Sequence, residues 1–187
     1  MFTSYLGIEK VLQPSWPAPA RVKAFTTTSN TQIAGVAASQ GNYASFNLGL
    51  NVGDNPAEVT ARREALAAAL GRPLNWLNQT HSNLAISSLA ANCEADASVT
   101  SSKEFACVVL TADCLPVFFC DAQGRQVGVA HAGWRGLAAG VLENTLKKFT
   151  CPKNEILAWL GPAISQQVFE VGAEVTDAFL APSPQAI

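Results

Sequence analysis

The sequence predicts one domain that combines α-helices with short β-strands. A chain of 187 residues has the length of a single domain, and 49% hydrophobic residues supply enough apolar side chains for a core. One helix carries clear start and stop signals, beginning near residue 56. The middle of the chain contains short β-branched or aromatic segments separated by turns, which are typical of strands. We therefore expect a single mixed domain over residues 1–187.

The N-terminal stretch is expected to be extended. Pro14, Pro17 and Pro19 follow one another closely, and proline disfavours a helix both at its own position and at the residue before it. A short strand is predicted at 22–27. A polar loop containing glycine and serine follows at 29–40.

The first helix has signals at both ends. Asp54 or Asn55 can cap its N-terminus, and Pro56 suits the first helical position. Gly71 is placed to end the helix.

One charged residue lies within the apolar stripe of this helix. The stripe is Val59, Leu66 and Leu70, and Arg63 falls in its middle, four residues after Val59. An arginine on a buried face needs a partner for its charge. That partner is either an internal carboxylate or a bound anion such as phosphate.

The second half of the chain alternates between strand and helix signals. Strands are expected at 105–110, 115–120, 125–131 and 155–161, with a hairpin turn at 122–124. Helices are expected at 134–149 and 169–180. No further element is predicted between residue 180 and Ile187.

Composition excludes several classes of protein. Lys and Arg number 12 against 14 Asp and Glu, so the basic excess of a nucleic-acid-binding protein is missing. No apolar run approaches the ~18 residues that a membrane-spanning helix needs. The N-terminus lacks the features of a signal peptide, and the five cysteines are scattered. We therefore expect reduced thiols, a cytoplasmic protein, and neither nucleic acid nor membrane as a partner.

The chain has only two histidines, and a cysteine lies between them. His81 lies in LNQTHSN, Cys114 in TADCLPV, and His131 in VGVAHAGWRGLAAGV. Each is expected at a strand end or in a loop, where a rigid scaffold can hold it. Two imidazoles and a thiolate suit zinc with one position left for water. The alternative is two ordinary hydrogen-bonded histidines near a buried thiol.

A second interpretation of the same residues is a nucleophilic pair. Cys114 would attack a substrate and His131 would act as its base. Asp113 would then orient the histidine.

The turn HAGWRG also has features of an anion-binding loop. Gly133 and Gly136 permit a close backbone approach, and free N–H groups begin the helix that follows. Arg135 adds a fork of donors, so Arg135 and Arg63 are two candidate phosphate contacts.

Several motifs together resemble one known family, the YfiH-like or laccase-domain proteins. Four carry most of the resemblance: QTHS at 79–82, ADCLPV at 112–117, HAGWRG at 131–136 and LGPAISQQVFEVG at 160–172. Two others agree with it: SFNLGLNVGDNP followed by Arg63, and EADAS at 94–98. The similarity spans residues 22–180.

This resemblance implies an α+β fold of mixed β-sheets flanked by helices, an α/β/β/α-type sandwich. It implies a single metal ion held by His81, Cys114 and His131. Members typically run some tens of residues further and carry a C-terminal segment near the site, and we expect this chain to lack it.

The resemblance also implies a substrate pocket and an activity. Asn47, Arg63 and Gln79 are expected to line that pocket. The implied function is a zinc-dependent enzyme on purine nucleosides. It would carry out phosphorolysis of adenosine, inosine, guanosine or methylthioadenosine, and deamination of adenosine. Its partners would be the nucleoside and phosphate, and the oligomeric state is left open.

Three alternatives remain open at this point. The family label suggests a copper-dependent polyphenol oxidase of the laccase type, but two histidines can build only one small site. A cell-wall-precursor hydrolase using Cys114 is another. The third is a binding module without enzymatic activity.

Overall fold

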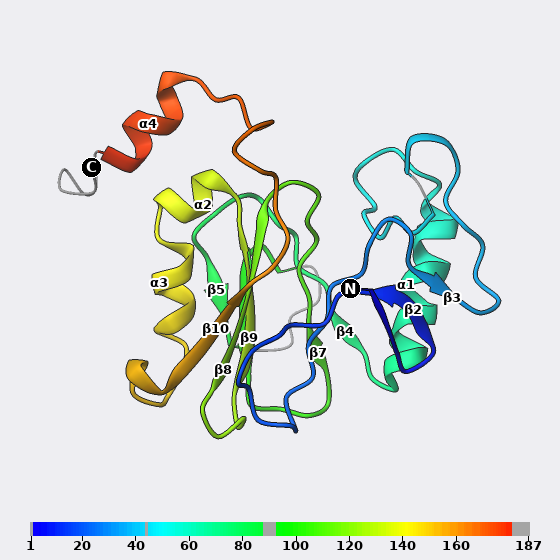
Figure 1. Ribbon diagram of the computed structural model, residues 1–187, viewed down its shortest axis with the longest axis horizontal. Helices are drawn as coiled ribbons and strands as arrows, with labels where there is room; N and C mark the ends of the chain where they lie inside the picture. The colour runs from blue at the N-terminus through cyan, green and yellow to red at the C-terminus, as the bar shows by residue number, and fades with distance from the viewer. Residues whose placement is uncertain (1, 44, 88–92, 181–187) are drawn as a thin grey trace. The chain divides into compact units, whose positions relative to one another are not determined.

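The computed structural model describes residues 2–43, 45–87 and 93–180, and the chain forms two compact units (Figure 1). The first unit comprises Met1–Trp16, Lys23–Leu74 and Glu104–Ala106. The second comprises Pro17–Val22, Asn75–Lys103 and Cys107–Ile187. That the whole chain is one domain stays a prediction.

The first unit contains a small antiparallel sheet. Its strands are β1 (Thr3–Tyr5), β2 (Ile8–Val11) and β3 (Gln32–Ile33), in the order β1-β2-β3. The strand predicted at 22–27 is wrong, because only a single bridge joins Leu12 to Thr26 there. Pro14 lies two residues after Leu12, and proline has no N–H with which to extend the pairing beyond this bridge.

A capped helix follows a short 3-10 turn, η1 (Gly41–Tyr43), in the same unit. This helix, α1 (Pro56–Leu70), begins after Asn55, whose side chain accepts a 3.0 Å hydrogen bond from Ala57 N–H. It ends at Gly71, which has φ 64°, a left-handed conformation that glycine adopts without steric cost. Both predicted ends are therefore confirmed, and Asn55 is the cap.

The arginine buried on α1 is Arg62, so the prediction for Arg63 is wrong by one position. The buried residues of α1 are Val59, Arg62 and Leu66, whereas Arg63 is only half-buried. The face that packs inward is thus turned by one residue from the predicted stripe. Spacings of three and four residues both fit one helix face, and the sequence pattern does not choose between them.

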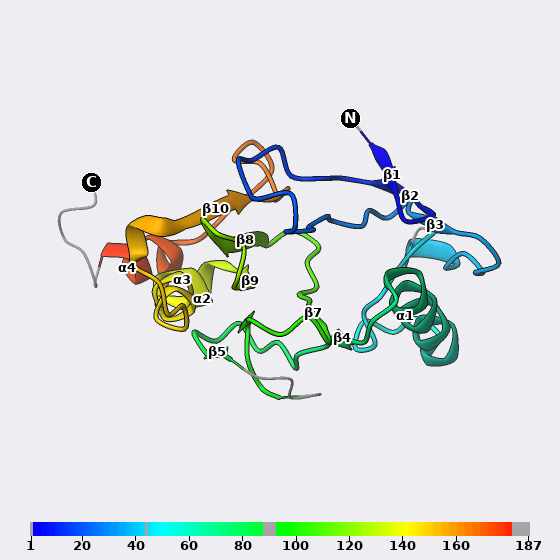
Figure 2. The same ribbon diagram turned by 90° about the horizontal axis from the view of Figure 1, so that it is seen from below.

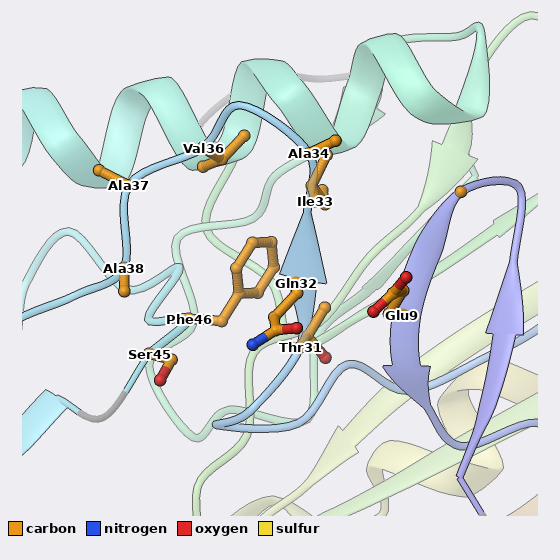
Figure 3. A pocket seen from close by; sticks show the side chains of 11 residues that line it. Glu9, Thr31, Gln32, Ile33, Ala34, Val36, Ala37, Ala38, Ser45 and Phe46 are labelled. Atoms are coloured by element: carbon orange, nitrogen blue, oxygen red, sulfur yellow. The ribbon is translucent and has the colours of Figure 1, made fainter.

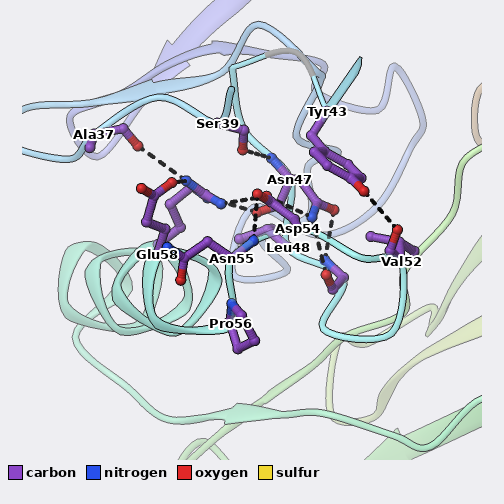
Figure 4. Close-up of polar contacts among 12 residues, drawn as sticks. Ala37, Ser39, Tyr43, Asn47, Leu48, Val52, Asp54, Asn55, Pro56 and Glu58 are labelled. Carbon is purple, nitrogen blue, oxygen red and sulfur yellow. Dashed lines mark hydrogen bonds and ion pairs between the residues drawn. The ribbon is translucent and has the colours of Figure 1, made fainter. Parts of the chain in front are cut away.

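The charge of Arg62 is satisfied inside the unit by partners that include Asp54, Glu58 and Asn47, which Figure 4 labels. Its Nη2 lies 2.7 Å from Asp54 Oδ2, and its Nε donates to the carbonyl oxygen of Asn47 at 2.9 Å. Asn47 Nδ2 donates to the same carboxylate at 3.0 Å. Hydrogen bonding from Asn47, followed by that of the Asn55 N–H and by the Arg62 charge, holds the pKa of Asp54 below its ordinary value. Of the two partners that the sequence left open for a buried arginine, Arg62 has the carboxylate.

A cavity of about 360 Å³ also belongs to the first unit (Figure 3). Small apolar side chains and the Phe46 ring make up much of its wall, with a few polar groups between them. Its lining residues are Gly7, Glu9, Thr31, Gln32, Ile33, Ala34, Val36, Ala37, Ala38, Ser45 and Phe46.

The second unit is built on a five-stranded mixed sheet. Its order is β10-β8-β9-β6-β5. The strands are β5 (Ala85–Ile86), β6 (Ala97–Thr100), β8 (Leu115–Asp121), β9 (Val127–Ala132) and β10 (Ile156–Leu160). Only β5 and β6 run parallel, and every other pair is antiparallel. The strands predicted at 115–120, 125–131 and 155–161 and the hairpin turn at 122–124 are confirmed.

Helices cover one face of this sheet, with α3 packed against β9, β6 and β5 (Figures 1 and 2). The helical segments are α2 (Trp134–Ala138), α3 (Val141–Leu146), the 3-10 turn η2 (Lys153–Glu155) and α4 (Ala173–Leu180). The core between helices and sheet consists of Ala97, Val99, Val117, Phe119, Ala130, Ala132, Val141 and Phe149. The helix predicted at 169–180 is α4, which begins at Ala173, four residues later than predicted.

The single helix predicted at 134–149 is two helices. Gly140 has φ 90° between α2 and α3, and the chain turns there. Asn83 Nδ2 donates to the carbonyl oxygen of Ala139 at 2.8 Å, so a side chain from a distant loop satisfies the broken end. The periodicity of apolar residues over 134–149 does not predict this break, because the group that satisfies it, Asn83, lies far away in the sequence.

The strand predicted at 105–110 is also shorter than expected. A two-stranded sheet pairs β4 (Leu74–Asn75) with β7 (Ala106–Cys107). Beyond β7, the amide of Gln79 bonds both backbone groups of Leu110, donating to its carbonyl at 2.8 Å and accepting from its N–H at 2.7 Å. A side chain therefore takes the place of a neighbouring strand.

The fold class is confirmed: mixed sheets with helices packed against them form an α+β protein. All five cysteines are free thiols. Within the described ranges, no helix is both long and apolar enough to span a membrane. The cytoplasmic location stays a prediction.

Replacing Arg62 with methionine should destabilise the protein far more than the same change at Arg63. R62M leaves the Asp54 carboxylate buried without its ion partner, and we expect the melting temperature to fall by about 10 °C. R63M removes a half-buried side chain, and we expect less than half that shift. Thermal unfolding followed by circular dichroism measures both. Equal shifts, or no recovery of stability in the double variant R62M/D54N, would contradict the assignment.

Candidate metal centre

Three residues from separate segments converge in the second unit. His81, Cys114 and His131 each offer one ligand atom, and these atoms lie within 4.8 Å of one another. Cys114 Sγ is 3.9 Å from His81 Nε2, and the two imidazole rings lie 4.8 Å apart at an angle of 74°. In the part of the chain that the structure describes, no other set of three or more His, Cys, Asp or Glu side chains lies close enough together to hold a metal ion.

The β8–β9 hairpin positions two of the three. His131 lies on β9 with its backbone opposite Pro116 of β8. Cys114 immediately precedes β8, so the register of the hairpin places its thiol near the imidazole. Strand pairing brings them together although 17 positions separate them.

His81 reaches the group from a loop before β5. Its φ is 58°, in the left-handed region where a side chain costs about 1–2 kcal/mol. His81 is exposed, Cys114 is half-buried and His131 is 4% exposed. The group therefore opens towards solvent on the side of His81. Strained backbone at a ligand-bearing residue is typical of functional sites.

A buried carboxylate holds both histidine-bearing segments. Asp96 Oδ1 lies 2.7 Å from His131 Nδ1, and Asp96 is fully buried. Burial acts to raise the pKa of Asp96. The hydrogen bonds from His131, from the Ser82 hydroxyl and N–H, and from the Thr80 N–H outweigh burial and lower it to about 2. The carboxylate is thus ionised at neutral pH.

Asp96 is the functional residue that sequence reasoning missed. The nucleophile interpretation gave the role of orienting His131 to Asp113, and that assignment is wrong because Asp96 contacts the ring. An available signal was the acidic residue in EADAS, directly before the fully buried strand β6. A carboxylate at such a position needs internal donors.

The glycines of HAGWRG serve close packing around the ligands. A Cβ on Gly133 would lie 2.8 Å from His81 Cδ2 and 3.0 Å from Cys114 Sγ. A Cβ on Gly136 would lie 2.7 Å from the carbonyl oxygen of Ser82. The predicted close approach at these glycines is confirmed, but the atoms that come close belong to His81, Cys114 and Ser82. Arg135 is exposed, with its guanidinium 4.2 Å above the ring of Trp134.

The environment of Cys114 disfavours a free thiolate. Burial, followed by the charges of Asp113 and Asp96, raises the pKa of the Cys114 thiol above its ordinary value. In the protein without metal the thiol is therefore neutral and a weak nucleophile. Metal binding takes place with loss of this proton.

The predicted substrate-contacting residues fall in both units. Gln79 belongs to the second, and its amide is bonded to Leu110. Asn47 and Arg63 belong to the first. The Asn47 amide bonds Gly49 and Asp54, and Arg63 Nε donates to the carbonyl oxygen of Leu48 at 2.8 Å. The role of these three in a substrate pocket, like that of Arg135, stays a prediction.

The residues present fit a metal ion. Two imidazole nitrogens and one thiol sulfur form the three-ligand set of catalytic zinc sites, which keep one position open. The hydrogen bond between Asp96 and His131 is the outer contact that ligating histidines normally make. A closed structural site would need a fourth protein ligand.

An α+β fold with one open group of two histidines and a cysteine defines a candidate metalloprotein. The chain belongs to the family described as multi-copper polyphenol oxidoreductase laccase, whose model matches residues 25–187. This is the YfiH-like family that the sequence motifs resemble.

Named relatives and a solved structure agree with this membership. A purine nucleoside phosphorylase of Pseudomonas aeruginosa is 47% identical over 176 residues, covering 94% of this chain and 71% of the relative. The purine nucleoside phosphorylase YfiH of Escherichia coli K12 is 46% identical over 184 residues, covering 96% and 74%. A Neisseria meningitidis crystal structure of family DUF152 has a TM-score of 0.87 at 50% identity, covering 94% of this chain and 72% of that one.

The strained backbone of His81 predicts a difference between two variants that both lose the ligand. H81G should be more stable than H81A by about 1 kcal/mol, because glycine adopts positive φ without steric cost. Urea unfolding of the metal-free proteins measures the difference. Equal stability, or a more stable H81A, would mean that the left-handed conformation is not retained.

A methyl group at Gly133 should weaken metal binding by roughly tenfold or more, because His81 and Cys114 would have to shift. Competition with a chelator measures the affinity of G133A. The matched control is G128A on β9, whose Cβ would meet Val99 at 2.9 Å in the core. G128A should lose stability and keep its metal affinity. Similar affinity losses in both variants would count against a local effect.

Proposed function

We propose that this chain is a zinc-dependent enzyme that carries out phosphorolysis of purine nucleosides. One observation carries the proposal. A three-ligand group with an exposed side occurs in a chain that shares 46–47% identity, over nearly its whole length, with proteins named purine nucleoside phosphorylases. Adenosine, inosine, guanosine and methylthioadenosine are the proposed substrates.

In this reaction an oxygen of phosphate bonds to C1′ of the ribose while the bond from C1′ to the purine nitrogen breaks. The base leaves with the electron pair and takes up the proton that the phosphate gives up. The other product is the sugar 1-phosphate, which is ribose 1-phosphate for adenosine, inosine and guanosine. A bound zinc ion supplies a Lewis acid that can hold an anionic oxygen or lower the pKa of a water. Catalysis then consists mainly of positioning and charge stabilisation.

The residues divide into holding and binding roles. His131 is buried and hydrogen-bonded, so it is the rigid ligand, while exposed His81 is the ligand on the side where substrate can approach. Arg135 is the second residue of α2, exposed and with its guanidinium over the Trp134 ring, and we assign it to phosphate. Arg63 belongs to the first unit, and its contact with phosphate stays a prediction from the family resemblance.

Deamination of adenosine is a second proposed activity of the same site. A water oxygen would add to C6 of the purine, a proton of that water would pass to the amino group, and ammonia would leave. A metal held by His81, Cys114 and His131 would activate that water. Chromatography distinguishes the two reactions, because deamination yields inosine and phosphorolysis yields adenine.

Polyphenol oxidation with copper is favoured by the family description. Two histidines and a cysteine do bind copper in electron-transfer sites. Both histidines of this chain are already used in one group, however, so its residues supply a single small site. Four-electron reduction of oxygen uses several copper centres, and we therefore rank this function second. The cell-wall hydrolase is ranked below it, because burial and the charges of Asp113 and Asp96 raise the pKa of the Cys114 thiol and disfavour the nucleophilic thiolate.

Purified protein should release hypoxanthine from inosine only when phosphate is present, with ribose 1-phosphate formed in equal amount. H81A should lower this rate by at least about a hundredfold, because one of three ligands is lost. C93S is the matched control, since Cys93 lies outside the group, and it should keep full activity. Retained activity in H81A would remove the metal from the reaction. Phenol oxidation that scales with copper content, without phosphorolysis, would favour the oxidase.

A further inference from the structure

Asp96 is attached to His131 at two points. Its carbonyl oxygen accepts the His131 N–H at 2.7 Å, and its carboxylate oxygen Oδ1 bonds the ring nitrogen Nδ1 at 2.7 Å. The next residue, Ala97, is paired with Ala130 across β6 and β9. The backbone and the ring of His131 are therefore fixed by one residue on a neighbouring strand.

The same carboxylate collects three successive N–H groups of the His81 loop. Thr80 N–H donates to Oδ2 at 3.2 Å, His81 N–H to Oδ1 at 3.1 Å, and Ser82 N–H to Oδ2 at 2.7 Å. The Ser82 hydroxyl adds a further hydrogen bond to Oδ2 at 2.7 Å. Successive N–H groups converge on one anion when a residue in the loop is left-handed, and His81 is that residue.

Oδ1 of Asp96 thus bonds both histidines, one through its ring and the other through its backbone. We propose that Asp96 is the positioning residue of the centre, which sets the His131 tautomer and the His81 loop together before any metal arrives. Four donors of the His81 loop already point at the two oxygens of this carboxylate, which therefore acts as an acceptor, so His131 Nδ1 carries the proton that it shares with Oδ1. The lone pair is then on Nε2, the other ring nitrogen, and is available to a metal.

This inference rests on the proposed metal site but not on the proposed reaction. It assigns no substrate and needs no turnover. Its first test also needs no metal, so it can succeed or fail independently of the enzyme activity.

Nitrogen NMR of the metal-free wild-type protein, labelled with ¹⁵N-histidine, tests the tautomer directly. The chain has two histidines, and H81A assigns the signals. We expect His131 to be protonated at Nδ1, the tautomer that a free imidazole populates less. Protonation at Nε2 would overturn the proposal.

The variant D96N tests the effect on binding, because an amide has one acceptor oxygen and one donor group. If the amide oxygen takes the place of Oδ2, the NH₂ faces His131 Nδ1 and the His81 N–H, and the tautomer reverses. If the oxygen takes the place of Oδ1, the NH₂ faces the Thr80 and Ser82 N–H groups, and the loop is released. Either outcome should lower affinity for zinc, measured by chelator competition, by about 10- to 100-fold.

D121N is the matched control. Asp121 is also buried in this sheet and accepts two backbone N–H groups, from Arg125 and Gln126, but it does not contact the ligands. D121N should lose stability while its zinc affinity stays within about threefold and its His131 tautomer is unchanged. Zinc affinity in D96N equal to that of wild type, or an equal loss in D121N, would overturn the proposal. If D96N does not fold, the wild-type tautomer decides.

Discussion

The candidate centre depends on one buried negative charge meeting the N–H groups of a loop and of an imidazole. A carboxylate removed from water is costly unless donors replace the solvent, and Asp96 has five within hydrogen-bond reach. Those donors come from two segments that must lie side by side for the charge to be satisfied. Because this one carboxylate needs donors from both segments, it brings the two histidines together. Its hydrogen bonds also compensate for the strain of the left-handed backbone at His81.

The first unit contains a comparable cluster around a buried positive charge, that of Arg62. Arg62 is fully buried, and its donors face the carboxylates of Asp54 and Glu58 and the carbonyl oxygens of Asn47 and Ala37. This cluster orders the loop before α1, because Asp54 and Asn47 are both bonded to it. Each unit therefore has a buried charged side chain, Asp96 or Arg62, that needs polar partners. Most of those partners lie in a loop, and supplying them fixes the conformation of that loop.

Fold and chemistry are linked through the β8–β9 hairpin and the glycines that follow it. The hairpin places Cys114 beside His131, and Gly133 leaves room for the thiol and for His81 to approach. The group has one exposed side, and the raised pKa of the Cys114 thiol means that a metal bound there would displace the thiol proton. With two histidines in the chain, these constraints define one small centre.

The local features of the chain are encoded in its sequence. The caps of α1, the strands of the central hairpin and the three residues of the candidate centre follow from propensity, turn chemistry and the scarcity of histidine. Tertiary packing selects the buried arginine, because Arg62 and Arg63 fit the helical period almost equally. It also decided that Asn83 satisfies the broken helix at Ala139, that Gln79 replaces a strand beside Leu110, and that Asp96 holds His131. These are contacts between residues far apart in the chain, and no local pattern encodes which distant group will satisfy a buried donor or acceptor.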